Sequence, residues 1–116
     1  MADIVNIGLS PTAHETANAM LDDFTALKDV GKFAFAIAIK NDLLMNPDYM
    51  DLKESKRSVW NVGSIDPDGK MASLVKSLYE NITEPYKYIE LLINAGLIYL
   101  RESTNLDSSI DIGDYL

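Results

Sequence analysis

The stretch Phe33-Ala-Phe-Ala-Ile-Ala-Ile39 decides the fold class, because its pattern fits either a strand or a helix. Its larger apolar residues alternate with period two, which is typical of a half-buried strand. The residues between them are alanines, however, and alanine is the best helix former. The apolar character also continues beyond Lys40 to Met45. The sequence therefore predicts a helix over residues 30–45. Because apolar residues occur nearly all round it, we expect burial at the centre of the molecule or at a subunit contact.

A short strand and a first helix precede this segment. Residues 4–9 alternate with period two, which predicts a strand with one apolar face made of Val5, Ile7 and Leu9. Ser10-Pro11 predicts a helix start, since a hydroxyl cap is followed by proline at the first helical position. Apolar residues at spacings of three and four carry this helix to about Leu27. Asp29 is then the expected cap of the helix over residues 30–45.

The second half of the chain contains two further helix starts. Before them, residues 59–62 are expected to form a short extended piece that docks Trp60 on the body. Asp66-Pro67 predicts a helix whose apolar stripe runs at 3-4-3 spacing, and Glu84-Pro85 predicts another that reaches about Arg101. The stripe consists of Met71, Leu74, Val75, Leu78, Tyr79 and Ile82. The expected fold class is therefore mainly α, with an N-terminal strand and about four helices. We expect a single domain over residues 1–101 and an acidic, flexible tail over residues 102–116.

Composition limits the classes of function. The 116 residues include 18 acidic and 10 basic side chains, a net charge of −8, and no cysteine. Disulfides and thiolate metal sites are excluded, and a cytoplasmic location is expected. No apolar run is long enough for a membrane span, and the first residues lack a signal-peptide pattern. The acidic balance disfavours nucleic acid as a partner, because phosphate contacts need basic side chains.

No motif indicates catalysis, a metal or a cofactor. His14 is the single histidine, and no second histidine or cysteine stands at the spacing of a zinc site. Asp66-Pro-Asp-Gly69 resembles part of a calcium loop, but Ser64 and Val75 would occupy the first and twelfth ligand positions, which require acids. We therefore expect a protein that is not an enzyme and that uses no cofactor.

The N-terminal part resembles a known family. Residues 4–45, with the order strand, helix, longer helix, are similar to the ribbon-helix-helix arrangement. The start Ile7-Gly-Leu-Ser-Pro11, followed by residues 27–39, looks like the beginning of DndE-type proteins, which belong to DNA sulfur-modification systems. The resemblance implies that the strands of two copies pair across a two-fold axis and that strand side chains contact DNA. Of the outward strand positions, Asn6 has a suitable side chain, whereas Asp3 would repel phosphate.

Three functional hypotheses follow. The first is a non-enzymatic interaction or assembly module that forms a homo-oligomer, in the simplest case a dimer. Its expected interface residues are Val5, Ile7, Leu9, Phe33, Phe35, Ile37 and Ile39. The second is a DNA-binding protein of ribbon-helix-helix type, with contacts from Asn6, Lys53, Lys56 and Arg57. The third is an acidic inhibitor or decoy whose tail binds a basic surface on another protein.

Overall fold

The computed structural model describes residues 3–43 and 56–104, and this part of the chain is mainly helical, as predicted. It contains a second strand that the sequence indicated only as an extended piece. In chain order the elements are β1 (Asn6–Leu9), α1 (Pro11–Met20), the 3-10 turn η1 (Leu21–Asp23), α2 (Leu27–Lys40), β2 (Arg57–Asn61), α4 (Val62–Ile65), α5 (Lys70–Leu78) and α6 (Pro85–Thr104).

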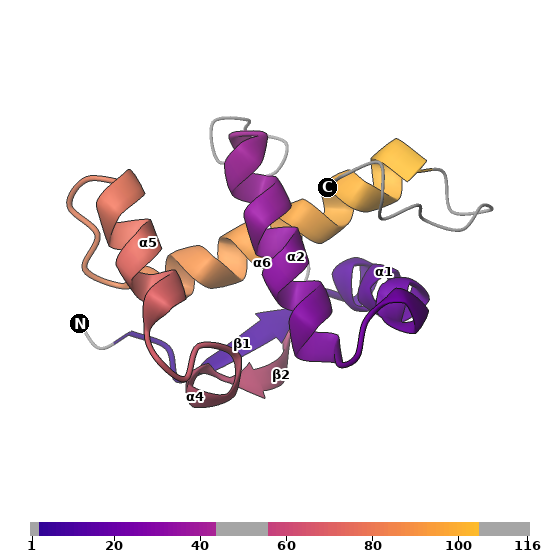
Figure 1. Ribbon diagram of the computed structural model, residues 1–116, viewed down its shortest axis with the longest axis horizontal. Helices are drawn as coiled ribbons and strands as arrows, with labels where there is room; N and C mark the ends of the chain where they lie inside the picture. Colours follow the sequence, from indigo (N-terminus) through magenta and orange to yellow (C-terminus); the bar gives the residue numbers. More distant parts are fainter. Residues whose placement is uncertain (1–2, 44–55, 105–116) are drawn as a thin grey trace.

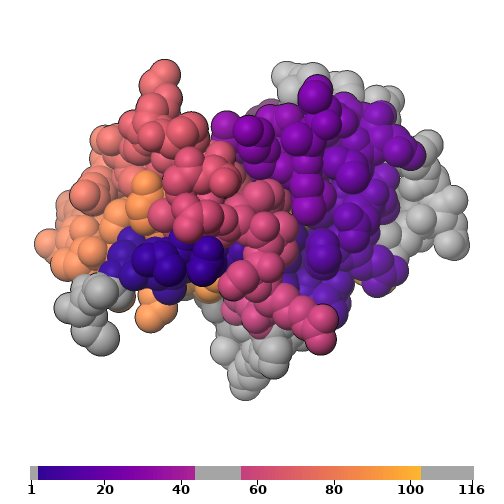
Figure 2. Space-filling model, turned by 90° about the horizontal axis from the view of Figure 1, so that it is seen from below, coloured from indigo at the N-terminus to yellow at the C-terminus, as the bar shows by residue number. Residues whose placement is uncertain are grey.

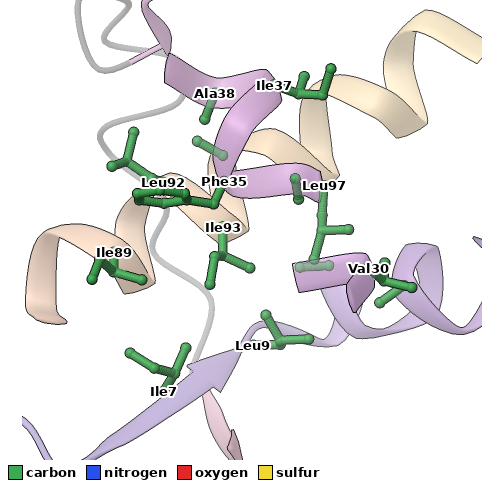
Figure 3. Close-up of a cluster of buried hydrophobic side chains, with 14 of the residues drawn as sticks. Ile7, Leu9, Val30, Phe35, Ile37, Ala38, Ile89, Leu92, Ile93 and Leu97 are labelled. Atoms are coloured by element: carbon green, nitrogen blue, oxygen red, sulfur yellow. The ribbon is translucent and has the colours of Figure 1, made fainter. Parts of the chain in front are cut away.

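Helices α2 and α6 cross at the centre of the molecule. Helix α1 packs toward one end of this pair and α5 toward the other, while β1 and β2 lie along one side (Figure 1). Side chains from β1 and from both central helices meet between these elements (Figure 3). The largest fully buried residues include Ile7, Leu9, Val30, Ile89, Leu92, Ile93 and Leu97.

The crossing of α2 and α6 is close because Gly96 has no side chain. A Cβ atom on Gly96 would overlap the carbonyl oxygen of Ala34 on α2, and it would lie 2.7 Å from the carbonyl carbon of the same residue. On α2 itself, Gly31 leaves room for the ring of Trp60, which would lie 2.9 Å from an added Cβ. Helix α2 therefore takes the first of its two predicted positions, the centre of the molecule. Its buried apolar residues are Val30, Ala34, Phe35, Ile37 and Ala38, whereas Phe33 and Ile39 are partly buried.

The two strands form an antiparallel ribbon. Asn6 lies opposite Asn61 and Ile7 opposite Trp60, with an irregularity between Ile7 and Gly8. Trp60 is 8% exposed, so the predicted docking of this residue is confirmed. The strand begins at Asn6 instead of residue 4, and Val5 is 64% exposed. The prediction that Val5 shares a buried face with the later strand residues was therefore wrong.

The predicted boundary between the first two helices was also wrong. Helix α1 ends at Met20, and the extended residue Phe24 turns its ring onto Phe33, with 5.5 Å between the ring centroids. Helix α2 then begins at Leu27, so Asp29 lies in its first turn and is not the cap. A carboxylate in the first turn still stabilises the positive end of a helix. Helix α2 ends at Lys40; residues 44 and 45 of the predicted helix lie outside the described ranges.

The start of α5 and the end of α6 also differ from the prediction. Helix α5 begins at Lys70, three residues after Pro67, because Gly69 adopts a left-handed conformation with φ of 73°. Such a φ is readily accessible to glycine. Helix α6 begins at Pro85 as predicted but continues to Thr104, beyond the expected domain limit at residue 101. The rest of the predicted acidic tail, residues 105–116, lies outside the described ranges.

Candidate interaction surfaces

Most of the residues predicted to form an oligomer interface lie in the core of a single chain. Ile7 is fully buried, Leu9 is 1% exposed, Phe35 is 5% exposed and Ile37 is 3% exposed. Figure 3 shows these side chains among residues of α6 and α2. The other three are Phe33 and Ile39, which are partly buried, and the exposed Val5. Four of the seven predicted interface residues are therefore core residues of one chain, and the predicted interface itself stays a prediction.

Both edges of β1 are occupied within the chain. One edge pairs with β2. On the other edge, the Gly8 N–H donates to Glu90 Oε2 at 2.9 Å and the Ser10 N–H donates to Asn94 Oδ1 at 2.9 Å. Asn94 Nδ2 also donates to the Gly8 carbonyl at 2.9 Å. Here β2, and not a second copy, supplies the partner strand of β1, which corrects the two-fold strand pairing implied by the resemblance.

Sequence reasoning missed the roles of Glu90 and Asn94. Asn94 is fully buried, and its side chain holds strand β1 against α6. A signal was present, because the two polar residues stand four apart on a helix that is otherwise largely apolar, and residues at that spacing share a face. The partner of that face, β1, lies more than 80 positions away in the chain.

Two leucines on α5 form the exposed apolar surface of this helix. The predicted helical stripe continues only to Leu78, because α5 ends there and Tyr79 is extended, so Tyr79 and Ile82 lie beyond the helix. Within α5, α6 covers Met71, which is 8% exposed, and Val75, which is fully buried. Leu74 is 43% exposed and Leu78 is 50% exposed, one turn apart on the same face. We call Leu74 and Leu78 the α5 patch. Together with Val5 they are the large hydrophobic residues that the described part of the chain exposes.

Hydrogen bonds fix the orientation of α5 relative to α6. The buried Asp66 carboxylate accepts from the N–H groups of Met71 at 3.0 Å and Ala72 at 3.1 Å, in the first turn of α5. It also accepts from the Tyr86 hydroxyl on α6 at 3.1 Å. Burial raises the pKa of the Tyr86 phenol, and the hydrogen bond to Asp66 and the nearby negative charges raise it further. The protonated hydroxyl therefore holds the two helices together.

A second long-range cap fixes the start of α6. The Asp3 carboxylate accepts from the Tyr86 N–H at 2.8 Å and from the Lys87 N–H at 3.1 Å. These amides have no partner within the first turn of a helix, so a carboxylate there satisfies them and stabilises the positive helix end. Asp66 and Asp3 therefore fix the starts of α5 and α6, and the α5 patch lies on a helix that is joined to α6 through Asp66.

The ribbon brings together residues that are about fifty positions apart in the chain. Asn6, Ser58 and Asn61 are exposed, and Arg57 is exposed at the end where it pairs with Leu9. We call these four residues the ribbon surface; Figure 2 shows the N-terminal segment beside residues 56–70 on this side of the molecule. Lys56 lies next to it and is partly buried against Gly8. Three predicted nucleic-acid contacts therefore lie on or beside one ribbon, with Asn6 at one end and Arg57 and Lys56 toward the other, and Lys53 lies outside the described ranges.

His14 lines a groove of about 490 Å³ between α1 and the start of β2. The other lining residues are Leu9, Pro11, Glu15, Asn18 and Arg57. Within residues 3–43 and 56–104, no three His, Cys, Asp or Glu side chains are grouped so that they could hold a metal ion. None of the described helices is long and apolar enough to cross a membrane.

Comparison of the chain with protein-family models, with curated proteins and with solved structures gave no significant match. The arguments for function therefore rest on the surfaces described above.

Proposed function

We propose that this chain is a non-enzymatic, cytoplasmic assembly module that forms a homodimer through the α5 patch. The observation that carries the proposal is the exposure of Leu74 and Leu78 on a helix whose other apolar residues are already covered by α6. Burying apolar surface contributes about 25 cal/mol per Å². A second copy can cover these leucines with the same two residues of its own helix, as a two-fold axis requires.

The charges that flank the patch favour an antiparallel arrangement of the two α5 helices. Lys70 lies one turn before Leu74, with its Nζ 3.6 Å from Asp68 Oδ2, and Glu80 lies two residues after Leu78, beyond the end of α5. When the helices run in opposite directions, Leu74 of each copy faces Leu78 of the other, and each Lys70 lies toward the Glu80 of the partner. A parallel arrangement would instead place like charges together, which disfavours it.

The test introduces one charge into the patch. We expect Leu74→Asp to shift the chain from dimer to monomer in sedimentation experiments over a range of concentrations, because a buried unpaired carboxylate opposes association. Ser73→Asp is the matched control, since it places the same charge on the adjacent exposed position of α5. A wild-type chain that remains monomeric at the highest concentrations, or a control that dissociates equally, would contradict the proposal.

A second candidate function is nucleic-acid binding through the ribbon surface. It is favoured by the presence of Asn6 and Arg57 at the two ends of one two-stranded ribbon, with Lys56 next to Arg57 and Gly8. An antiparallel ribbon fits the major groove of DNA, and asparagine and arginine are side chains that hydrogen-bond to base edges. This proposal retains the resemblance of residues 4–45 to the ribbon-helix-helix arrangement, except that one chain supplies both strands of the ribbon.

This candidate is tested by the anisotropy of a fluorescently labelled duplex and of a nicked duplex at low salt. We expect binding that weakens with rising salt and that is reduced by Arg57→Glu. Lys40→Glu, at the far end of α2 from the ribbon, is the control (Figure 1). Absence of binding to both probes at low salt would eliminate this function.

A further inference from the structure

The groove beside His14 has the features of an anion site. Its walls are α1, which supplies His14, Glu15 and Asn18, and the start of β2, which supplies Arg57. Its volume of about 490 Å³ lies within the range of roughly 300–1,000 Å³ that is usual for small-molecule sites. The pairing of Leu9 with Arg57 fixes β2 against the beginning of α1, so the two walls are held together by backbone structure.

Charge in the groove favours an anion. The acidic wall residue, Glu15, has its carboxylate 3.6 Å from Arg101 Nη1 on α6, so its charge is balanced from outside the groove. Arg57, His14 and Asn18 remain, and each provides N–H donors. Among the described residues, no ion pair or hydrogen bond engages the side chain of Arg57 or of His14.

We propose that this groove binds a phosphate group, either free or as a phosphate ester, through Arg57, His14 and Asn18. Guanidinium binds phosphate oxygens through two parallel hydrogen bonds, which explains why arginine is frequent in phosphate sites. The imidazole and the amide of α1 supply further donors from the opposite wall. The phosphate can belong to a small molecule or to a nucleic-acid backbone that reaches the groove from the adjoining ribbon surface.

The experiment is an NMR titration of the full ¹⁵N-labelled chain with three probes: inorganic phosphate, a mononucleotide and a short DNA duplex. We expect saturable shifts of the His14, Asn18 and Arg57 amides with at least one probe. Response to phosphate or to the mononucleotide identifies a small-molecule site, and response to the duplex alone identifies a backbone phosphate. No saturable shift at these residues with any probe would overturn the proposal.

Because Arg57 belongs to both the groove and the ribbon surface, His14→Ala is the variant that separates the two. Arg57→Glu should weaken binding of the responding probe by about tenfold or more, since a charge-assisted hydrogen bond is lost. His14→Ala should weaken it without changing the ribbon surface, whereas Lys40→Glu should leave it unchanged. Asn6→Ala changes the ribbon alone: phosphate binding that persists in this variant supports the groove, and phosphate binding that is lost with Asn6 contradicts it. Binding that is insensitive to both groove variants would place the anion elsewhere and contradict the assignment.

Discussion

At the scale of single residues, buried polar side chains join segments that lie far apart in the sequence. Asn94 bonds to both Gly8 and Ser10, and Asp66 bonds to the start of α5 and to Tyr86. Each of these side chains satisfies backbone groups or a hydroxyl that would otherwise be buried without a partner. Their loss therefore has a larger effect than the loss of an exposed hydrogen bond.

Asn94→Ala should destabilise the fold by about 3 kcal/mol, because the Ser10 N–H and the Gly8 carbonyl lose their side-chain partner in the interior. Urea unfolding measures the change in free energy. Amide hydrogen exchange shows which part of the chain is destabilised, and we expect faster exchange of the Ser10 amide in the variant. A variant as stable as wild type, with an unchanged Ser10 exchange rate, would show that this bond does not hold β1 to α6.

Tyr86→Phe should make the protein less sensitive to alkaline pH. The pKa of Tyr86 is raised in the fold, first by burial and then by Asp66. Its contribution to stability is therefore complete below the unfolded value of about 10 and is lost as the pH rises through the folded pKa. Burial and Asp42 also raise the pKa of Tyr79, which retains part of the alkaline sensitivity in the variant.

Thermal unfolding of wild type and Tyr86→Phe between neutral and strongly alkaline pH measures this effect. At neutral pH the variant should have a slightly lower melting temperature than wild type, since the hydrogen bond to Asp66 is absent. Above pH 10 the melting temperature of the variant should fall by less than that of wild type. Parallel curves for the two proteins would indicate that the hydroxyl does not titrate with unfolding.

At the scale of elements, the sequence predicted segments well and their ends less well. The apolar surface of residues 33–39 indicated a central helix because alanine favours helix and the apolar character continues beyond Lys40, although the alternation of the larger residues also fitted a strand. Proline at positions 11 and 85 correctly marked the starts of two helices, since its ring fits the first helical position. By contrast, Asp29 and Pro67 were assigned to helix starts that the packing of Phe24 and the conformation of Gly69 moved elsewhere.

The candidate sites were less predictable for a physical reason. The apolar surface of residues 33–39 is covered by α6, a helix that lies about sixty positions later in the chain. The spacing of apolar residues shows that a helix has a buried face, but it does not identify the helix that covers this face. Likewise, Asn6 and Arg57 belong to one ribbon only through strand pairing. Leu74 and Leu78 were recognised as apolar positions on one face, but their exposure depends on how much of α5 is covered by α6.

Gly96→Ala tests the close crossing of α2 and α6. The added methyl group overlaps the Ala34 carbonyl, which belongs to a backbone that cannot move without shifting a helix. We expect a loss of about 3 kcal/mol in the free energy of unfolding. Gly63→Ala is the control, since its nearest contact is the Asn61 side chain, and we expect a change within about 1 kcal/mol. Equal stability of both variants would mean that the helices cross less closely.

At the scale of the whole molecule, part of the acidity serves the fold. Asp3, Asp66 and Glu90, three of the 18 acidic residues, accept hydrogen bonds from backbone N–H groups. Such acids stabilise helix starts and a strand. Net charge therefore gives an incomplete guide to the surfaces of this chain, where Arg57 and His14 line one groove.

The central claim, dimerisation through antiparallel α5 helices, is tested most directly by exchanging its flanking charges. We predict that Lys70→Glu and Glu80→Lys each shift the sedimentation equilibrium toward monomer, because each single change places like charges opposite one another across the two-fold axis. The double variant should recover the dimer, since the opposite charges then face each other with their signs reversed. Dissociation that is the same in the double variant as in the single variants, or a dimer that is unaffected by all three, would contradict this arrangement.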